Sequence, residues 1–223
     1  MTVWDAGTGE RLRSIRASAP IAVPLFTPDD QHVVGISGES RIVRWNATTW
    51  AVEQDAETGV PLGRMSAITP DGSTLVTAND SGVVRFWGLS TLREQGSSTE
   101  HKGLVSSIQF SPDGLVMATG SFDGSVRLWD WRARTVSAVL ESHQGWIGSV
   151  AFSPDGRRLA TGGNDGTVTF WNMADQQELV SFQRHRDLVS GLAFTRDGQL
   201  LATTGGPIVR LWRAASPEVG KDY

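Results

Sequence analysis

Tryptophan recurs through this sequence at a nearly constant interval. Six of the nine tryptophans follow one another at steps of about 42 residues, at Trp4, Trp45, Trp87, Trp129, Trp171 and Trp212. A fixed period of about 20 to 50 residues is typical of chains built from repeated structural units, such as solenoids and propellers. The period therefore restricts the fold before any single segment is interpreted.

A turn motif and a histidine keep the same interval. The motif Ser/Thr-Pro-Asp-Gly, or a close variant of it, occupies residues 27–30, 69–72, 111–114, 153–156 and 195–198. Three of the four histidines, His101, His143 and His185, are separated by the same step as the tryptophans. Three of the intervals therefore share an internal order, in which a histidine is followed by a turn and then by a tryptophan.

The pattern inside one interval predicts β-structure. Between residues 104 and 140, short apolar or alternating runs are separated by turn sequences, which predicts strands at 104–110, 116–121, 125–129 and 135–140. Residues 173–185 come closest to a helical pattern, but the register of the repeat predicts a strand at 178–182. Four short strands in one such interval are typical of one blade of a β-propeller.

At this point the motifs resemble those of the WD-repeat (β-transducin-like) propellers. The best copies are Asp-Gly-Ser-Val-Arg-Leu-Trp-Asp at 123–130 and Asp-Gly-Thr-Val-Thr-Phe-Trp-Asn at 165–172. The resemblance covers nearly the whole chain, and the style of the repeats is similar to that of bacterial members. It implies an all-β propeller in which each periodic tryptophan closes a third strand and an outer strand follows.

Counting strands by this resemblance gives an unfinished ring. It implies four full four-stranded blades with a partial blade at each end, about five blades in all. Residues 1–16 would end a preceding repeat, residues 17–212 would form five repeat units of one propeller domain, and residues 213–223 would be a disordered tail. Three interpretations stay open: a fragment of a larger ring, which we favour, an open ring completed by a partner chain, or a strained five-blade ring closed by pairing 11–15 with 207–212.

The resemblance also assigns a structural role to the recurring polar residues. In the family, a histidine, a Ser/Thr, a turn aspartate and the tryptophan form a hydrogen-bonded tetrad that holds one blade together. Because the set recurs in successive repeats, we expect this role rather than a catalytic triad, and we expect no metal or cofactor. The matching residues are His101, Thr119, Asp123 and Trp129, then His143, Thr161, Asp165 and Trp171, and finally the incomplete set His185, Thr203 and Trp212.

The composition argues against several classes of binding partner. The net charge is −4, which argues against a broad electrostatic surface for nucleic acid or anionic membranes. The sequence has no cysteine, so disulfides and thiolate chemistry are excluded. No apolar run approaches the length of about 20 residues that spans a membrane, and no signal peptide is visible. We therefore expect a cytoplasmic protein.

The remaining candidates lie on the loops where partners of this family often dock. Trp146 stands outside the periodic series, so an aromatic anchor surrounded by polar groups is one interpretation. The other is that Trp146 caps the interior of its blade and Phe122 packs on its neighbour. The full candidate set is Trp146, Phe122, Asn164, Leu104, Leu188, Asp80, Lys102, Gln144, Arg186 and Arg64.

The resemblance implies a non-catalytic scaffold for protein–protein interaction, expected here within a larger signalling or regulatory protein. Its partner would be a protein or peptide, with self-association as a further expectation if blade faces are left uncovered. An alternative is a reader of peptides or small anions that uses Lys102, Arg186 and Arg64. A less favoured alternative is an enzyme with its site in the central channel, although no set of unlike polar residues marks one.

Overall fold

Strands account for all the regular secondary structure in the described part of the chain. The computed structural model describes residues 2–15, 20–37 and 40–213. The chain divides into two compact units, residues 1–105 and 106–223, which are described separately below. The described residues include no helix that is long and apolar enough to cross a membrane. The tail that the sequence predicted at 213–223 lies, beyond Arg213, outside the described residues.

The first unit contains a two-stranded sheet, β1-β2, followed by two four-stranded sheets in the order β3-β4-β5-β6 and β10-β9-β8-β7. Every pairing within these sheets is antiparallel. The innermost strands β3 and β7 of the two larger sheets contact each other. The strands are β1 (Thr2–Trp4), β2 (Arg11–Ser14), β3 (Ile21–Phe26), β4 (His32–Ser37), β5 (Arg41–Asn46), β6 (Val52–Glu57), β7 (Met65–Ile68), β8 (Thr74–Ala78), β9 (Val84–Gly88) and β10 (Arg93–Ser98).

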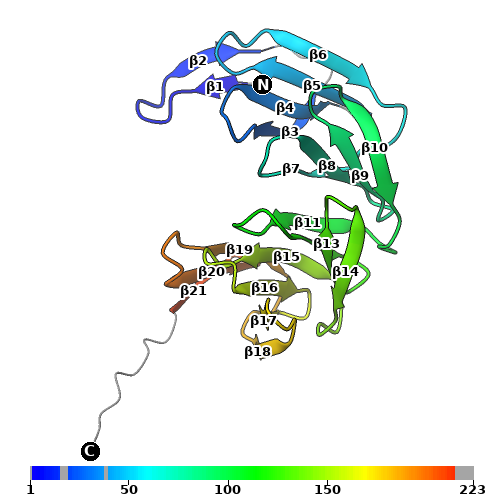
Figure 1. Ribbon diagram of the computed structural model, residues 1–223. Helices are drawn as coiled ribbons and strands as arrows, with labels where there is room; N and C mark the ends of the chain where they lie inside the picture. Colours follow the sequence, from blue (N-terminus) through cyan, green and yellow to red (C-terminus); the bar gives the residue numbers. More distant parts are fainter. Residues whose placement is uncertain (1, 16–19, 38–39, 214–223) are drawn as a thin grey trace, which may run out of the picture. The chain divides into compact units, whose positions relative to one another are not determined.

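The second unit continues the same construction (Figure 1). The sheet orders are β11-β12-β13-β14, β15-β16-β17-β18 and β19-β20-β21, and β15 contacts β19 of the following sheet. Its strands are β11 (Val105–Phe110), which begins at the last residue of the first unit, β12 (Met117–Ser121), β13 (Val126–Asp130), β14 (Thr135–Leu140), β15 (Ile147–Phe152), β16 (Arg158–Gly163), β17 (Thr167–Asn172), β18 (Glu178–Gln183), β19 (Val189–Phe194), β20 (Leu200–Gly205) and β21 (Ile208–Arg213).

These sheets confirm the predicted blades. The described residues form four complete four-stranded sheets, with sheets of two and three strands at the two ends of the chain, as the sequence predicted. The four strands expected between residues 104 and 140 agree with β11–β14 to within one residue at each end. The segment at 178–182 is strand β18, so the repeat register was a better guide there than the local helical pattern.

Burial explains why each sheet has the composition that the sequence shows. The middle strands β8 and β12 are buried along their whole length, because both faces of the sheet are covered. The outer strands β10 and β18 are largely exposed, and most residues of β10 are polar. Small, β-branched and aromatic residues therefore concentrate in the inner strands, where they pack on the neighbouring sheets.

The Pro-Asp-Gly turns close the hairpins between the first and second strands. Gly72, Gly114, Gly156 and Gly198 all have φ near +70°, a conformation that glycine adopts without steric cost. Asp30 takes the glycine position in the first turn with φ of 57°, which aspartate tolerates better than most residues. In every one of these turns the hydroxyl of the leading Ser or Thr donates to the aspartate, at 2.5–2.6 Å.

Candidate functional site

A hydrogen bond from the periodic tryptophan to a threonine hydroxyl recurs in four sheets. Each threonine lies on the second strand of its sheet, and each tryptophan on the third. The Nε1–Oγ1 distances are 3.0 Å for Trp87 to Thr77, 2.8 Å for Trp129 to Thr119, 3.0 Å for Trp171 to Thr161 and 3.0 Å for Trp212 to Thr203. This contact ties two strands of each sheet through an otherwise apolar core.

The sheet β3–β6 is the exception. Gly35 stands one repeat before Thr77, so this sheet has no hydroxyl at that position, and the buried Nε1 of Trp45 has no partner. A Cβ at Gly35 would lie 2.8 Å from Ile21 Cγ2 and 3.1 Å from the Trp45 ring, so these two side chains occupy the space of the absent one. The spacing alone could have revealed this difference, because Gly35 stands where the later repeats have a threonine.

One sheet brings all four members of the predicted tetrad together. His143 Nε2 lies 2.8 Å from Thr161 Oγ1, and His143 Nδ1 lies 3.4 Å from Asp165 Oδ1. Because the Trp171 N–H donates to Thr161, the threonine hydroxyl can donate to Nε2 while the Nδ1–H donates to Asp165. A single tautomer of His143 thus satisfies the whole chain of buried polar groups.

The electrostatics of this sheet favour an ionised Asp165. Burial opposes ionisation, but the backbone N–H groups of Thr167 and Gln144 and the ring of His143 outweigh it, so the pKa of Asp165 is lowered from its ordinary value. The N–H of Thr167 donates to Oδ1 at 2.9 Å, and that of Gln144 donates to Oδ2 at 3.1 Å. Asp165 therefore connects the loop before β15 to the turn between β16 and β17.

The last sheet holds the tetrad without its aspartate. His185 Nε2 lies 2.7 Å from Thr203 Oγ1, but the buried Nδ1 has no partner. Gly205 is close enough that an added Cβ would lie 2.6 Å from this nitrogen. Burial, with the nearby charge of Arg210, lowers the pKa of His185, so the neutral ring is favoured.

The remaining tetrad residues are divided between the units. His101 is buried in the first unit, whereas Thr119, Asp123 and Trp129 belong to the second. Asp123 Oδ1 accepts from the Ser125 N–H at 3.0 Å and from its hydroxyl at 2.6 Å. Its Oδ2 lies 3.1 Å from Arg127 Nη1, so this aspartate also forms an ion pair within its own sheet.

Two of the predicted docking residues form an aromatic pair in the second unit. The rings of Phe122 and Trp146 are 4.0 Å apart at an interplanar angle of 66°. Phe122 comes from the turn between β12 and β13 and is 42% exposed, and Trp146 precedes β15 and is half-buried. With Glu141 and Gln144 they line an open pocket. We name this region the aromatic-pair surface.

Backbone contacts fix the position of this surface. The N–H of Asn164 donates to the carbonyl of Trp146 at 2.9 Å. A Cβ at Gly145 would lie 2.0 Å from Asn164 Oδ1, so the Asn164 side chain packs directly on that glycine. Leu188 packs in the same way on Gly148, where a Cβ would lie 2.5 Å from its Cδ1. The surface is thus attached to three successive sheets of the unit.

The other docking candidates are divided between the two units. Gln144 and Arg186 are exposed in the second unit. The three basic candidates fall in different units, because Arg64 and Lys102 belong to the first and Arg186 to the second. The first unit also contains the exposed Asp80 and the half-buried Leu104.

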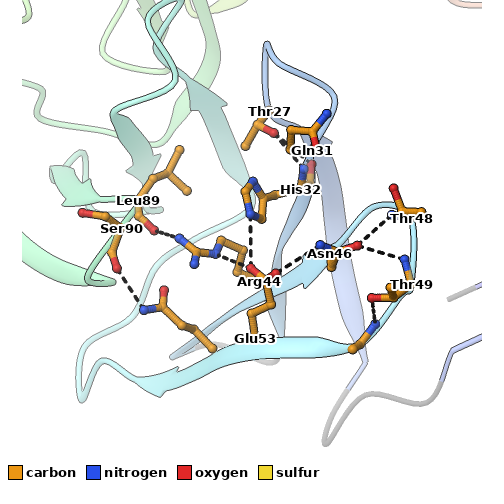
Figure 2. Close-up of polar contacts among 12 residues, drawn as sticks. Thr27, Gln31, His32, Arg44, Asn46, Thr48, Thr49, Glu53, Leu89 and Ser90 are labelled. Carbon is orange, nitrogen blue, oxygen red and sulfur yellow. Dashed lines mark hydrogen bonds and ion pairs between the residues drawn. The ribbon is translucent and has the colours of Figure 1, made fainter.

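A polar cluster in the first unit was not predicted from the sequence (Figure 2). Glu53 on β6 contacts three side chains: Oε2 lies 3.2 Å from His32 Nε2 and 3.3 Å from Arg44 Nε, and Oε1 accepts a hydrogen bond from Asn46 at 3.2 Å. Arg44 also donates to the carbonyl of Leu89, at 2.8 Å, in the following sheet. Arg44 stands where the repeat places Phe86, Leu128 and Phe170, so a charge in an apolar column was the available signal.

This cluster joins neighbouring sheets. Besides Arg44, Gln54 of β6 donates to the carbonyl of Ser90 at 2.9 Å, so two side chains of one sheet hold the β9–β10 turn of the next. The ionic groups are already paired with one another. Within the described residues, no group of three or more acidic or histidine side chains is arranged to hold a metal ion.

Comparison with known families matches the second half of the repeat series. A family model described as "WD domain, G-beta repeat" matches residues 93–130, 134–172 and 176–213. Each match begins near a fourth strand and ends at the third strand of the next sheet. A search of curated proteins found no match.

Proposed function

The chain belongs to the family of WD40-repeat proteins, and from this premise we propose that it is a non-catalytic interaction module whose docking site is the aromatic-pair surface. WD40 repeats generally act as scaffolds that mediate protein–protein interaction, and their domains are typically non-catalytic. The finer parts of the proposal are the position of the docking site, a cytoplasmic location and a role in a signalling or regulatory protein.

The contact between Phe122 and Trp146 is the observation that carries the proposal. Trp146 lies outside the periodic series, so the tryptophan–threonine contact of its sheet is made by Trp171 instead. Two aromatic rings that pack edge to face and remain partly exposed offer a large apolar area at a small cost in side-chain entropy. Residues of this kind dominate the binding energy of many interfaces when polar groups surround them.

The surroundings support the same use of the surface. Glu141 and Gln144 supply a polar rim on the pocket that the two rings line. The Asn164 contacts hold the Trp146 backbone in place, so little ordering would be needed when a partner binds. A rigid aromatic centre with a polar border therefore fits a protein or peptide partner.

The test compares proteins captured by the full chain and by two matched variants. Trp146→Ala removes the proposed anchor, and Leu115→Ala removes an apolar side chain that is 60% exposed in the turn between β11 and β12. At least one captured protein should bind about 10-fold more weakly to Trp146→Ala, and normally to Leu115→Ala. Captured proteins that bind equally to all three chains would refute the docking site.

The salt dependence of binding distinguishes the proposed docking site from the alternative function, in which basic residues bind an anion. Contacts made by exposed arginines and lysines weaken as ionic strength rises, whereas an apolar anchor is much less affected. A captured partner that is released by salt and is insensitive to Trp146→Ala would favour the basic candidates over the aromatic-pair surface.

A further inference from the structure

At the aromatic-pair surface, three positions of the repeat change their chemistry together. The residues 42 positions before Phe122, Glu141 and Trp146 are Asp80, Thr99 and Leu104, and those 42 positions after them are Asn164, Gln183 and Leu188. Neither neighbouring repeat has an aromatic residue at these positions, and neither has a carboxylate at the position of Glu141. Because the neighbouring sheets form without these side chains, their combination points to binding rather than to folding.

The pocket that the two rings line is acidic. Among the described residues, its lining includes the carboxylates of Asp123 and Glu141 and no lysine or arginine. Asp123 already forms an ion pair with Arg127, at 3.1 Å between Oδ2 and Nη1. Glu141 is exposed, and within the described part of the chain its carboxylate takes part in no hydrogen bond or ion pair. Glu141 therefore leaves an unpaired negative charge beside the aromatic rings.

The neighbouring repeats carry a positive charge where this surface has a neutral residue. Gln144 follows the tetrad histidine, and the residues at the matching positions of the two neighbouring repeats are Lys102 and Arg186. A cation at this position would repel a cationic ligand, whereas the neutral Gln144 does not. Together with the free carboxylate of Glu141, this difference makes the aromatic-pair surface more favourable to a cation than to an anion.

The two rings also favour a cation, because the faces of aromatic rings carry partial negative charge. The rings of Phe122 and Trp146 are inclined at 66° to each other, and no arginine or lysine of the described residues stacks on either. The same unit shows such a contact elsewhere, since the guanidinium carbon of Arg132 lies 4.2 Å from the centre of the Trp131 ring. The aromatic pair therefore has the chemistry to receive a cation from outside the chain.

From the rings, the free carboxylate and the missing basic residue together, we propose that the aromatic-pair surface binds an arginine side chain of a partner peptide. The guanidinium group stacks on the aromatic pair and donates to the carboxylate of Glu141. Arginine fits better than lysine, because its planar and weakly hydrated group can stack on a ring and pair with a carboxylate at the same time. This inference rests on the proposed function and deepens it by naming the side chain that the partner presents.

The experiment uses a probe of defined chemistry. The capped tripeptide acetyl-Gly-Arg-Gly-amide is titrated into the isotope-labelled full chain at low salt to about 10 mM, which measures a Kd as weak as about 1 mM. The control peptide carries citrulline, which has nearly the shape of arginine but no charge. Binding is followed by NMR at the backbone N–H signals of residues 122–124 and 144–146. The arginine peptide should bind saturably and at least about 5-fold more tightly than the citrulline peptide.

Variants of the protein locate the site. Glu141→Gln removes the free charge at an exposed position and should weaken binding of the arginine peptide by about 3-fold. The matched control Glu178→Gln removes an exposed carboxylate at the start of β18, and it should bind like the unchanged protein. Trp146→Ala should weaken binding by about 5-fold or more. Both glutamates are exposed, so their variants should retain the folded state, which circular dichroism checks.

Three results would overturn this inference: no binding of the arginine peptide, equal binding of the citrulline peptide, or equal binding by Glu141→Gln and the unchanged protein. The failure of this inference differs from that of the proposed function. Captured proteins that need Trp146 but bind Glu141→Gln normally, with no binding of the arginine peptide, would keep the docking site and refute its preference for arginine. Arginine-peptide binding that needs both Glu141 and Trp146 supports the inference even where no captured protein depends on Trp146.

Discussion

Replacing Thr161 by valine removes the hydroxyl on which the complete tetrad depends. Thr161 is fully buried, and its Oγ1 lies 2.8 Å from His143 Nε2 and 3.0 Å from Trp171 Nε1. Valine has nearly the same shape, so the substitution removes polar contacts with little change in packing. It leaves the indole N–H of Trp171 and the Nε2 of His143 without their partner.

The expected loss follows from these two contacts. A typical hydrogen bond contributes about 1 kcal/mol net to stability, and a buried polar group left unsatisfied costs about 1–3 kcal/mol. Because relaxation around the site recovers part of this, we expect Thr161→Val to lower the free energy of unfolding by about 2–4 kcal/mol. Thr135→Val, at an exposed position of β14, should change it by less than about 0.5 kcal/mol.

Urea denaturation followed by tryptophan fluorescence measures both variants, and native-state hydrogen exchange of β16 and β17 reports the local effect. Local measurement matters because repeat units can unfold separately. A loss below about 1 kcal/mol in Thr161→Val, or exchange that accelerates equally in all sheets, would refute the proposed tetrad energetics.

Two further predictions concern the same polar groups. His143→Phe should destabilise by about 1–2 kcal/mol more than His185→Phe in urea denaturation, because only His143 also contacts an aspartate; equal losses would contradict this. Asp165 has a lowered folded pKa, so its ionised form adds stability above the ordinary aspartate pKa of about 4, and this stability is lost as the pH falls through the folded pKa. Asp165→Asn should therefore flatten the acid side of the pH–stability profile, and an unchanged profile would argue against this contribution.

The sequence predicted the repeat and its strands because each depends on short-range patterns. The period of the tryptophans, the Pro-Asp-Gly turns and the alternation between them were enough to place β11–β14 to within one residue. The resemblance to WD repeats grouped His143 with Thr161, and the structure places His143 Nε2 and Thr161 Oγ1 2.8 Å apart. The sequence also identified the set of His185, Thr203 and Trp212 as one without an aspartate.

Sequence reasoning failed where the residues broke the pattern of the repeat. Arg44 occupies an apolar column, and its charge is accommodated by Glu53 on the adjacent strand and by the Leu89 carbonyl of the next sheet. The missing hydroxyl opposite Trp45 was overlooked for a related reason. Gly35 attracts no notice in the sequence, because its contact with Trp45 is seen only in the structure. Substitutions of this kind can be interpreted only when the residues that contact each position are known.

By itself, the sequence determined the repeated unit of this protein, because strand length, turn geometry and pairing within one sheet are local properties of a single repeat. The contacts between sheets were decided by tertiary structure. Phe122 and Trp146 meet because their two sheets pack at a particular separation and angle. No spacing rule encodes this contact, since it depends on how the neighbouring surfaces fit together.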